Sequence, residues 1–418
     1  MVFQGRRFST VLLAVVGFSL LGNVANAFDS NWPQWRGPLG TGHSTEDGFP
    51  TKWTADDVTW QVDLRGQGQS SPTIWGNRIF LTTALEQGAE RVVFCLDRNN
   101  GRVIWEKTAW KGSPNRAHKM NGWASASCTT DGEHVYGFFG TAGGVHCYTI
   151  DGEPVWSKEI GAFDNQWGEA ACPLIVDDVL IQVCDSDDNA YVMGLDKATG
   201  KEIWTTKRDN KRGWSSPILI NHSGRRQVVV NGDTGVRSYN PLTGREYWYC
   251  KSYNGRGTPT VTPGFDMIFS VNGKSGDVYA IKPDGSGNVT ETHQAWHTPR
   301  KGRDLPSPIL VEKSLLVASL RPGTLTSYNA LTGDVEWQGR LAGNNSSTPV
   351  SFDGLAFFIN EAGETVAVEP GGSEMKIVST NTVGAKEDEI FRASLTPSGG
   401  QIFIRSNKRL YCIGKRAK

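Results

Sequence analysis

The stretch LDKATGKEIW, residues 195–204, recurs along this chain and decides its fold. Close copies are YNPLTGREYW at 239–248 and YNALTGDVEW at 328–337, and looser copies end at Trp105, Trp156, Trp296 and Ile377, which replaces the Trp. In each copy an acidic or amide residue and a Gly form a turn, and β-forming residues follow. A turn Gly supplies the positive φ of a tight hairpin, and a Trp buries a large apolar area. The repeat therefore predicts hairpins whose outer strand covers the seam to the next unit.

A second signature comes earlier in each unit, where a small residue and a Pro open a β-rich run. The anchors are Pro72, Pro173, Pro217, Pro259, Pro308, Pro349 and Pro397, with Cys128 in the one double gap. Their mean spacing is about 46 residues, which is the length of a four-stranded propeller blade. Short β-branched segments alternate with Asp-Gly and Thr-Gly turns, as in hairpins. The sequence thus predicts an all-β, eight-bladed β-propeller of four-stranded antiparallel blades.

The two ends of the repeat array complement each other. The last unit ends at residues 410–414 without a Trp-bearing outer strand, whereas residues 57–64 carry Trp60 ahead of the first anchor. We expect this N-terminal strand to complete the eighth blade, because a closed ring leaves fewer exposed sheet edges.

The first 27 residues have the pattern of a secretory signal peptide. Arg6 and Arg7 precede the apolar run 11–22, which is too short to span a membrane, and an Ala-Asn-Ala cleavage site ends at Ala27. No Cys stands at that site, so no lipid anchor is expected. The expected organisation is a signal peptide at 1–27, a lead-in segment at 28–56 and the propeller at 57–418. The sequence therefore predicts a periplasmic or secreted protein without a transmembrane segment. We also expect the protein to be a monomer.

Charge argues against a nucleic-acid partner. Lys and Arg total 43 and Asp and Glu also total 43, with no basic block in the chain. Loss of the signal peptide removes two arginines and leaves a net charge near −2. No His, Cys or carboxylate spacing typical of a metal site is present, and the acidic run 185–189 lacks the Gly and distal Glu of a calcium loop.

Seven cysteines raise the question of disulfides, which an oxidising compartment permits. Around the turn Asp177-Asp178, Cys172 and Cys184 fall nearly opposite each other, at a separation suited to a disulfide. This pairing is the predicted disulfide. The alternative is that both are small buried apolar residues, because one residue of slip would put them on opposite faces.

The repeated motif resembles the PQQ-like β-propeller repeat family. That family contains quinoprotein dehydrogenases and the non-catalytic BamB-type outer-membrane assembly proteins, and residues 57–414 carry the resemblance. The segment 31–44, NWPQWRGPLGTGHS, also resembles the lead-in of secreted bacterial members.

The resemblance implies two alternative functions. The first is an exported, non-catalytic module that binds a protein, a peptide or a small polar ligand. The second is a periplasmic oxidoreductase that uses PQQ with Ca²⁺. The dehydrogenases typically have an adjacent Cys pair and carboxylate and amide ligands to calcium, and this chain has no adjacent cysteines. No catalytic residue and no resident cofactor are therefore assigned, and the non-catalytic alternative is preferred.

Residues just before each anchor should ring one mouth of the central channel. Flat aromatic rings and charged groups on one rim are typical of a polar-ligand or peptide site. The candidate ligand-binding residues are Trp123, Trp167, Glu169, Arg212, Trp214, Arg256, Asp304, Asn345 and Arg392. The alternative is that these polar residues only pair with one another.

Overall fold

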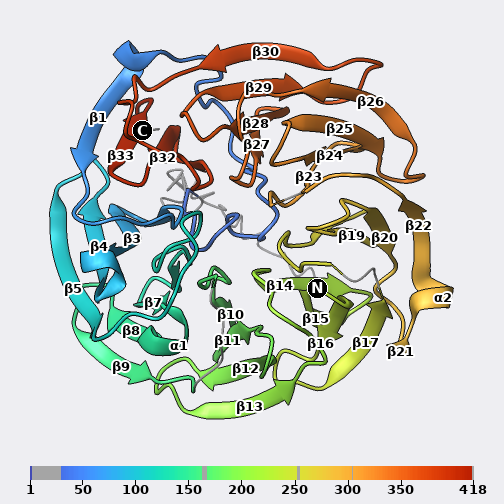
Figure 1. Ribbon diagram of the computed structural model, residues 1–418, viewed down its shortest axis with the longest axis horizontal. Coiled ribbons are helices and arrows are strands. Elements are labelled where there is room, and N and C mark those ends of the chain that lie inside the picture. Colours follow the sequence, from blue (N-terminus) through green and yellow to red (C-terminus); the bar gives the residue numbers. More distant parts are fainter. Residues whose placement is uncertain (2–29, 162–166, 252–254, 304, 417–418) are drawn as a thin grey trace.

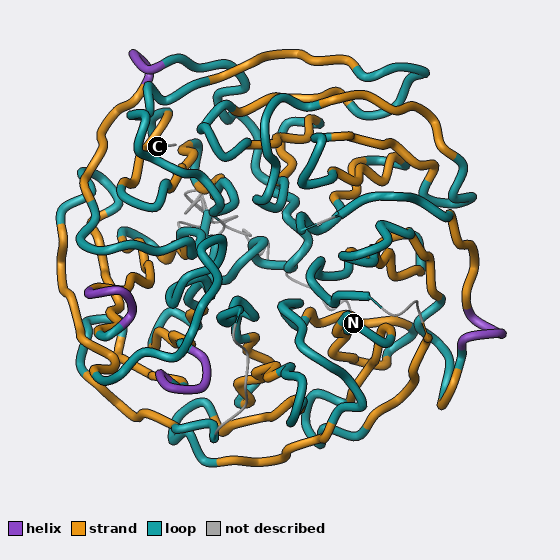
Figure 2. The backbone as a smooth tube through the Cα atoms, viewed as in Figure 1, coloured by secondary structure: helices purple, strands orange, loops and turns teal. Residues whose placement is uncertain are grey.

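Eight four-stranded units surround a central axis, which confirms the predicted propeller (Figure 1). The computed structural model describes residues 1, 30–161, 167–251, 255–303 and 305–416. The predicted signal peptide therefore lies almost entirely outside the described residues. In seven of the eight blades the outermost strand carries a Trp, and strands line the circumference while loops gather at the centre (Figure 2).

The first four blades follow the chain in order. Blade 1 comprises β2 (Thr73–Trp75), β3 (Arg78–Leu85), β4 (Glu90–Asp97) and β5 (Val103–Lys111). Blade 2 comprises β6 (Thr129–Thr130), β7 (His134–Phe138), β8 (Val145–Thr149) and β9 (Pro154–Lys158). Blade 3 comprises β10 (Leu174–Val176), β11 (Val179–Cys184), β12 (Tyr191–Asp196) and β13 (Glu202–Lys207). Blade 4 comprises β14 (Ile218–His222), β15 (Arg225–Val230), β16 (Gly235–Tyr239) and β17 (Glu246–Lys251).

The remaining blades include one insertion and the ring closure. Blade 5 comprises β18 (Thr262–Gly264), β19 (Met267–Val271), β20 (Val278–Ile281) and β22 (Gln294–Thr298), and its inserted β21 (Gly287–Asn288) pairs in parallel with β17. Blade 6 comprises β23 (Ile309–Val311), β24 (Ser314–Ala318), β25 (Thr324–Asn329) and β26 (Val335–Arg340). Blade 7 comprises β27 (Val350–Phe352), β28 (Leu355–Ile359), β29 (Thr365–Glu369) and β30 (Lys376–Asn381). Blade 8 comprises β31 (Thr396–Ser398), β32 (Gln401–Arg405), β33 (Arg409–Ile413) and β1 (Val58–Asp63).

Helices in the described part of the chain are single turns. They are η1 (Ala55–Asp57), η2 (Glu86–Gly88), α1 (Gly140–Gly143) and α2 (Thr290–His293). None of them has the length or the apolar character needed to cross a bilayer.

The predicted ring closure is confirmed. β1 pairs antiparallel with β33, with Trp60 opposite Cys412. The Trp60 indole donates a hydrogen bond to the Arg98 carbonyl oxygen of blade 1 (3.2 Å), and a Cβ at Gly101 would lie 2.7 Å from the Trp60 ring. The N-terminal strand thus locks the last blade onto the first.

The same contact explains the repeated motif. Trp156 donates from its indole to the Lys197 carbonyl oxygen of the next blade (2.9 Å) and packs over Gly200, where a Cβ would lie 2.5 Å away. Gly200 also has a φ of +70°, which disfavours other residues. The turn Gly of one blade therefore makes room for the Trp of the blade before it.

Blade 7 departs from the prediction. The register of β29 and β30 puts Ser379, rather than Ile377, at the position of the Trp, so the assignment of Ile377 was wrong by two residues. The Ser379 hydroxyl donates to the Thr51 carbonyl oxygen (2.6 Å), and the lead-in Trp53 stacks on Phe357 with the ring centroids 6.2 Å apart. Trp53 is 1% exposed, so an aromatic ring from outside the repeat covers this seam.

The predicted disulfide is not formed. All seven cysteines of the chain lie in described residues, and all are buried free thiols. β10 and β11 pair Leu174 with Ile181 and Val176 with Val179. This register is one residue away from the one that would put Cys172 opposite Cys184. The alternative interpretation, buried apolar cysteines, is the one that the structure supports.

Candidate functional site

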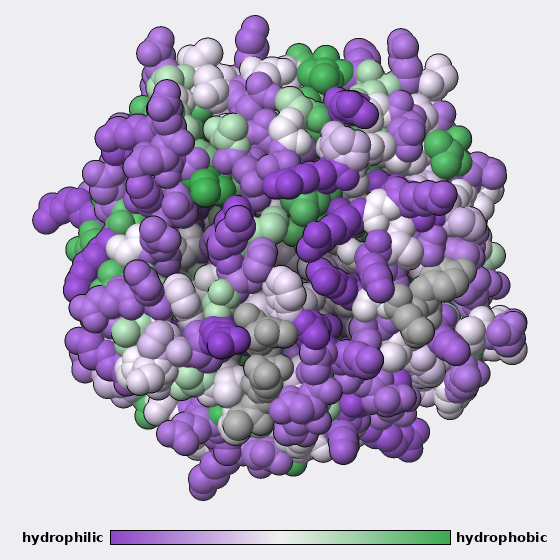
Figure 3. Space-filling model, in the orientation of Figure 1, coloured by the Kyte–Doolittle hydropathy of each residue, from purple (hydrophilic) through white to green (hydrophobic). Residues whose placement is uncertain are grey.

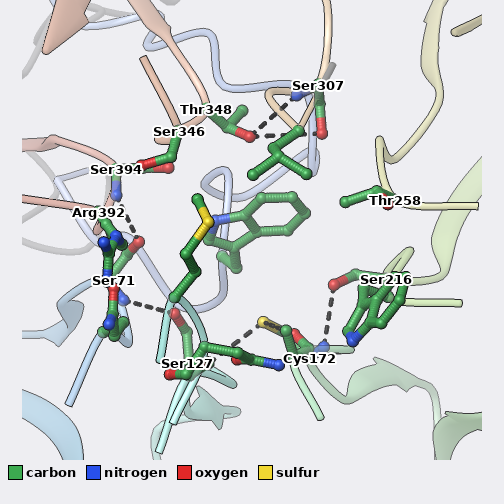
Figure 4. Close-up of a pocket in the computed structure, with 18 of the residues that line it drawn as sticks. Ser71, Ser127, Cys172, Ser216, Thr258, Ser307, Ser346, Thr348, Arg392 and Ser394 are labelled. Atoms are coloured by element: carbon green, nitrogen blue, oxygen red, sulfur yellow. Dashed lines mark hydrogen bonds between the residues drawn. The ribbon is translucent and has the colours of Figure 1, made fainter. Parts of the chain in front are cut away.

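A cavity of about 210 Å³ lies on the channel axis, at the end where the innermost strands begin. We call it the upper cavity. Seven of the eight blades contribute to its wall the residue that stands two positions before the innermost strand, because the converging blades bring these positions together. The wall residues are Ser71, Ser127, Cys172, Ser216, Ser307, Thr348 and Ser394 (Figure 4).

Hydrogen bonds join these wall residues from blade to blade. The Ser71 backbone N–H donates to the Ser127 hydroxyl (2.7 Å), and the Ser394 N–H donates to the Ser71 hydroxyl (2.9 Å). Equivalent donations run from Ser127 to Cys172, from Cys172 to Ser216, from Ser216 to Thr260, from Thr260 to Ser307 and from Ser307 to Thr348. We call this series of residues, which runs around the axis from Ser394 to Thr348, the hydroxyl ring. It satisfies buried backbone N–H groups that no strand pairs, and it explains the small residue at each anchor.

The hydroxyl ring also corrects two anchors. Thr262 donates to the Pro308 carbonyl oxygen (2.7 Å), as Thr73 does to the carbonyl oxygen of Cys128 (2.7 Å). Thr262 is therefore the equivalent of Thr73, and Val261 rather than Pro259 is the equivalent of Pro72. Thr396 bonds in the same way to the Pro72 carbonyl oxygen, so Pro397 is also displaced by two residues.

The lead-in segment closes the channel below the hydroxyl ring. Trp32 exchanges backbone hydrogen bonds with Ile74 of blade 1, and the Ser44 N–H donates to the Ser351 carbonyl oxygen of blade 7 (2.8 Å). Between these ends Trp35 lines both the upper cavity and a second cavity of about 380 Å³ under blades 3 and 4. Trp35 therefore forms the floor of the upper cavity.

Arg36 fixes the lead-in segment in place. Its guanidinium is 1% exposed and donates to the Val261 and Pro308 carbonyl oxygens and to the Thr262 hydroxyl, at 2.8–3.1 Å. Burial lowers the pKa of Arg36 to about 9. Trp35 and Arg36 stand between two prolines in the sequence, but this local pattern does not reveal that the pair reaches into the channel.

Above the hydroxyl ring, two predicted tryptophans meet two predicted arginines. Trp167, Trp214, Arg256 and Arg392 all line the upper cavity. The Arg256 guanidinium lies 5.6 Å from the centroid of the Trp167 ring, and the Trp214 indole donates to the Gly168 carbonyl oxygen (2.8 Å). These four residues are the part of the predicted rim that the fold brings together.

The other predicted rim residues lie elsewhere. Arg212 pairs with Asp187 beside Trp167 but does not line the cavity. Glu169 is buried against Gly140, and Asn345 is buried and donates to the Ala342 carbonyl oxygen. Trp123 lies in a neighbouring groove, where it packs on Gly88. Asp304 lies outside the described residues.

The loop that ends at the candidate Trp123 reaches over the mouth. Residues 112–123, here the mouth loop, carry His118, Met120 and Asn121 to the upper cavity, and His118 and Met120 were not among the predicted rim residues. The Asn121 side chain and the His118 N–H both donate to the Trp167 carbonyl oxygen, at 3.1 and 3.2 Å. The unusually long connection from β5 to β6 was the available signal for this loop.

Positive charge dominates the mouth. Arg392 pairs with Glu361 (2.8 Å) and Arg212 with Asp187, whereas Arg256 and Arg303 have no carboxylate partner among the described residues. Burial and the charges of Arg303 and Arg212 lower the pKa of Arg256. Burial and the nearby cationic side chains, including Lys119, Arg303 and Arg392, also lower the pKa of His118. The mouth therefore offers cationic charge that no carboxylate among the described residues compensates.

Comparisons with known proteins give the family. The family described as outer membrane protein assembly factor BamB matches residues 51–186, 89–285 and 188–417. The chain belongs to this BamB-type family of PQQ-like propellers. A curated BamB from Moranella endobia is 24% identical over 185 residues, which are 44% of this chain and 42% of the relative, so the match spans less than half of that protein.

Solved structures that resemble the chain share its fold. BamB from Moraxella catarrhalis aligns with a TM-score of 0.59 at 14% identity, over 86% of this chain and 97% of that one. A europium-containing methanol dehydrogenase aligns with a TM-score of 0.69 at 11% identity, over 93% and 98% of the two chains. At these identities the likeness establishes the propeller, and the function has to come from the site.

Proposed function

We propose that this BamB-type propeller is an exported, non-catalytic binding module that holds a segment of another protein at the mouth of its channel. Export rests on the N-terminal pattern around Arg6, Arg7 and Ala27 and on the outer-membrane role named in the family's description. The observation that carries the proposal is the mouth itself. Trp167 and Trp214 stand beside Arg256 and Arg303, two arginines without carboxylate partners among the described residues.

The tryptophans and arginines of the mouth are well suited to binding a peptide. Aromatic rings and arginines are enriched where proteins bind one another, because they combine apolar contact with hydrogen bonding. The upper cavity, at about 210 Å³, is smaller than the ~300–1,000 Å³ of ordinary small-molecule sites. It therefore fits one side chain or chain end of a bound segment, while the mouth contacts the rest.

The residues of the upper cavity do not fit PQQ with calcium. Calcium takes six to eight oxygen ligands, most of them carboxylates or carbonyls. No Asp or Glu among the described residues lines the upper cavity, and no cluster of three His, Cys, Asp or Glu residues in the described part of the chain could hold a metal. The wall residues are hydroxyls and one thiol, Cys172, whose pKa burial raises.

A peptide array tests the proposal. The mature protein is applied to unstructured twelve-residue peptides whose net charge ranges from −3 to +3. Replacing Trp214 with alanine should weaken peptide binding about tenfold, because an aromatic anchor is lost from the mouth. The matched control is Ile203→Ala on the outer strand β13, where the side chain is 48% exposed, and it should bind as the wild type does.

Two results would contradict the proposed function. One is a failure of the wild-type protein to bind any peptide on the array. The other is saturable binding of PQQ with Ca²⁺ accompanied by dye-linked alcohol oxidation, which would favour the oxidoreductase.

A further inference from the structure

We propose that the upper cavity is a carboxylate-binding site, in which Arg256 supplies the charge and the surrounding hydroxyl groups supply further donors. This inference rests on the proposed function and deepens it, because it names the chemical group that a bound segment inserts. The ligand is a carboxylate of an Asp or Glu side chain, or the C-terminal carboxylate of a partner chain.

The charge balance of the lining points to an anion. Arg256, Arg303, Arg392 and His118 line the upper cavity, and no acidic side chain among the described residues does. Glu361 neutralises Arg392 from outside the cavity. Arg256 is half-buried, and its guanidinium lies against the face of Trp167, which holds it beside the opening. A partly desolvated arginine without a carboxylate gains most from an anionic ligand, because an ionised acceptor strengthens its hydrogen bonds.

Hydroxyl donors are available in the same cavity. The Thr258 hydroxyl oxygen is buried, lines the cavity and has no hydrogen-bond partner among the described residues. The Ser71 hydroxyl oxygen accepts the Ser394 N–H, so its proton remains for another acceptor. Figure 4 shows Thr258 on the opposite side of the cavity from Ser71 and Arg392, so donors face the centre from several blades.

The shape of the cavity limits what enters. Trp35 closes it below, and Leu305 and Met120 add apolar surface to its wall. The buried Thr258 hydroxyl costs free energy while it has no partner among the described residues, and a carboxylate acceptor in the cavity would recover that cost. The volume of about 210 Å³ admits a carboxylate on a short stem and excludes a folded element.

Peptide titrations followed by NMR test this inference. The three probes are a capped seven-residue peptide with one central Glu, the same peptide with Gln, and an uncapped neutral peptide whose only carboxylate is its C-terminus. We expect either the Glu peptide or the uncapped peptide to bind at least tenfold more tightly than the Gln peptide. The one that does so identifies the source of the carboxylate.

Variants assign the effect to the cavity. Arg256→Gln should abolish the preference for the carboxylate, and Thr258→Val, which keeps the side-chain shape, should reduce it several-fold. The matched control is Arg102→Gln, which changes the net charge by as much as Arg256→Gln does. Arg102 is exposed in the turn between β4 and β5, at the end of blade 1 away from the mouth. This control should keep the wild-type preference.

Equal binding of all three peptides to the wild type would overturn the inference and leave the proposed function intact. A carboxylate preference that survives in both Arg256→Gln and Thr258→Val would also overturn it. Succinate serves as a fourth, non-peptide probe, and its binding without binding of any peptide would support the carboxylate site and contradict the proposed protein partner.

Discussion

Replacement of Asp185 by alanine is expected to lower the free energy of unfolding by about 3–5 kcal/mol, because it leaves a buried arginine without its counter-charge. Arg208 Nε lies 2.7 Å from Asp185 Oδ1, and the two side chains are 0% and 1% exposed. Arg208 also donates to the Tyr239 hydroxyl (2.8 Å). Burial, the largest single influence, would lower the pKa of Arg208, but the charges of Asp185 and Tyr239 and the hydrogen bonds to them together outweigh it, so the pKa rises.

A neighbouring residue supplies the control for this prediction. Asp187 follows in the same turn and pairs with Arg212 at the surface, where the two side chains are 38% and 29% exposed. Asp187→Ala should cost at most about 1 kcal/mol, as is usual for exposed pairs. Urea unfolding measures both variants. If Asp185→Ala and Asp187→Ala lowered the free energy of unfolding by similar, small amounts, the Asp185–Arg208 pair would not stabilise the fold as we infer.

Replacement of Trp60 by alanine is expected to cost about 2–4 kcal/mol, somewhat below the range for a fully buried Trp because Trp60 is half-buried. The change removes the ring that packs on Gly101 and the hydrogen bond to the Arg98 carbonyl oxygen. This seam is where the two ends of the chain meet, so the variant should also unfold less cooperatively.

Ile377→Ala is the control for ring closure. Ile377 is 50% exposed on the outer strand of blade 7, where its loss should change stability by no more than about 0.5 kcal/mol. Thermal unfolding by calorimetry compares the two variants. A Trp60→Ala protein that melted at the temperature of the wild type would contradict the closure.

The fold could be read from the sequence because its determinants are local and repeated. The Trp of one blade packs on the turn Gly of the next blade. Each copy of the motif therefore indicates a contact between blades as well as a hairpin. The unpaired Trp60 strand was informative for the same reason. Errors of two residues arose where a local signal was ambiguous. The anchor Pro directly follows the ring residue in five blades, but Pro259 precedes Thr260 and Pro397 lies three residues after Ser394.

The candidate site was harder to predict because it depends on contacts between distant segments. Trp35 reaches the upper cavity from the lead-in, and His118 reaches it from the mouth loop. Glu169 and Asn345 hold suitable rim positions in the repeat but turn into buried surroundings. Trp167, Trp214, Arg256 and Arg392 were found because the residues before an innermost strand must converge in a propeller.

Hydrogen–deuterium exchange on the complex with the tightest-binding peptide tests most directly whether the mouth is the binding site. We expect slower exchange in the mouth loop and in residues 213–216 and 255–258, with little change in the outer strands. Protection confined to the outer strands or to the lead-in segment, with the mouth loop unchanged, would contradict it.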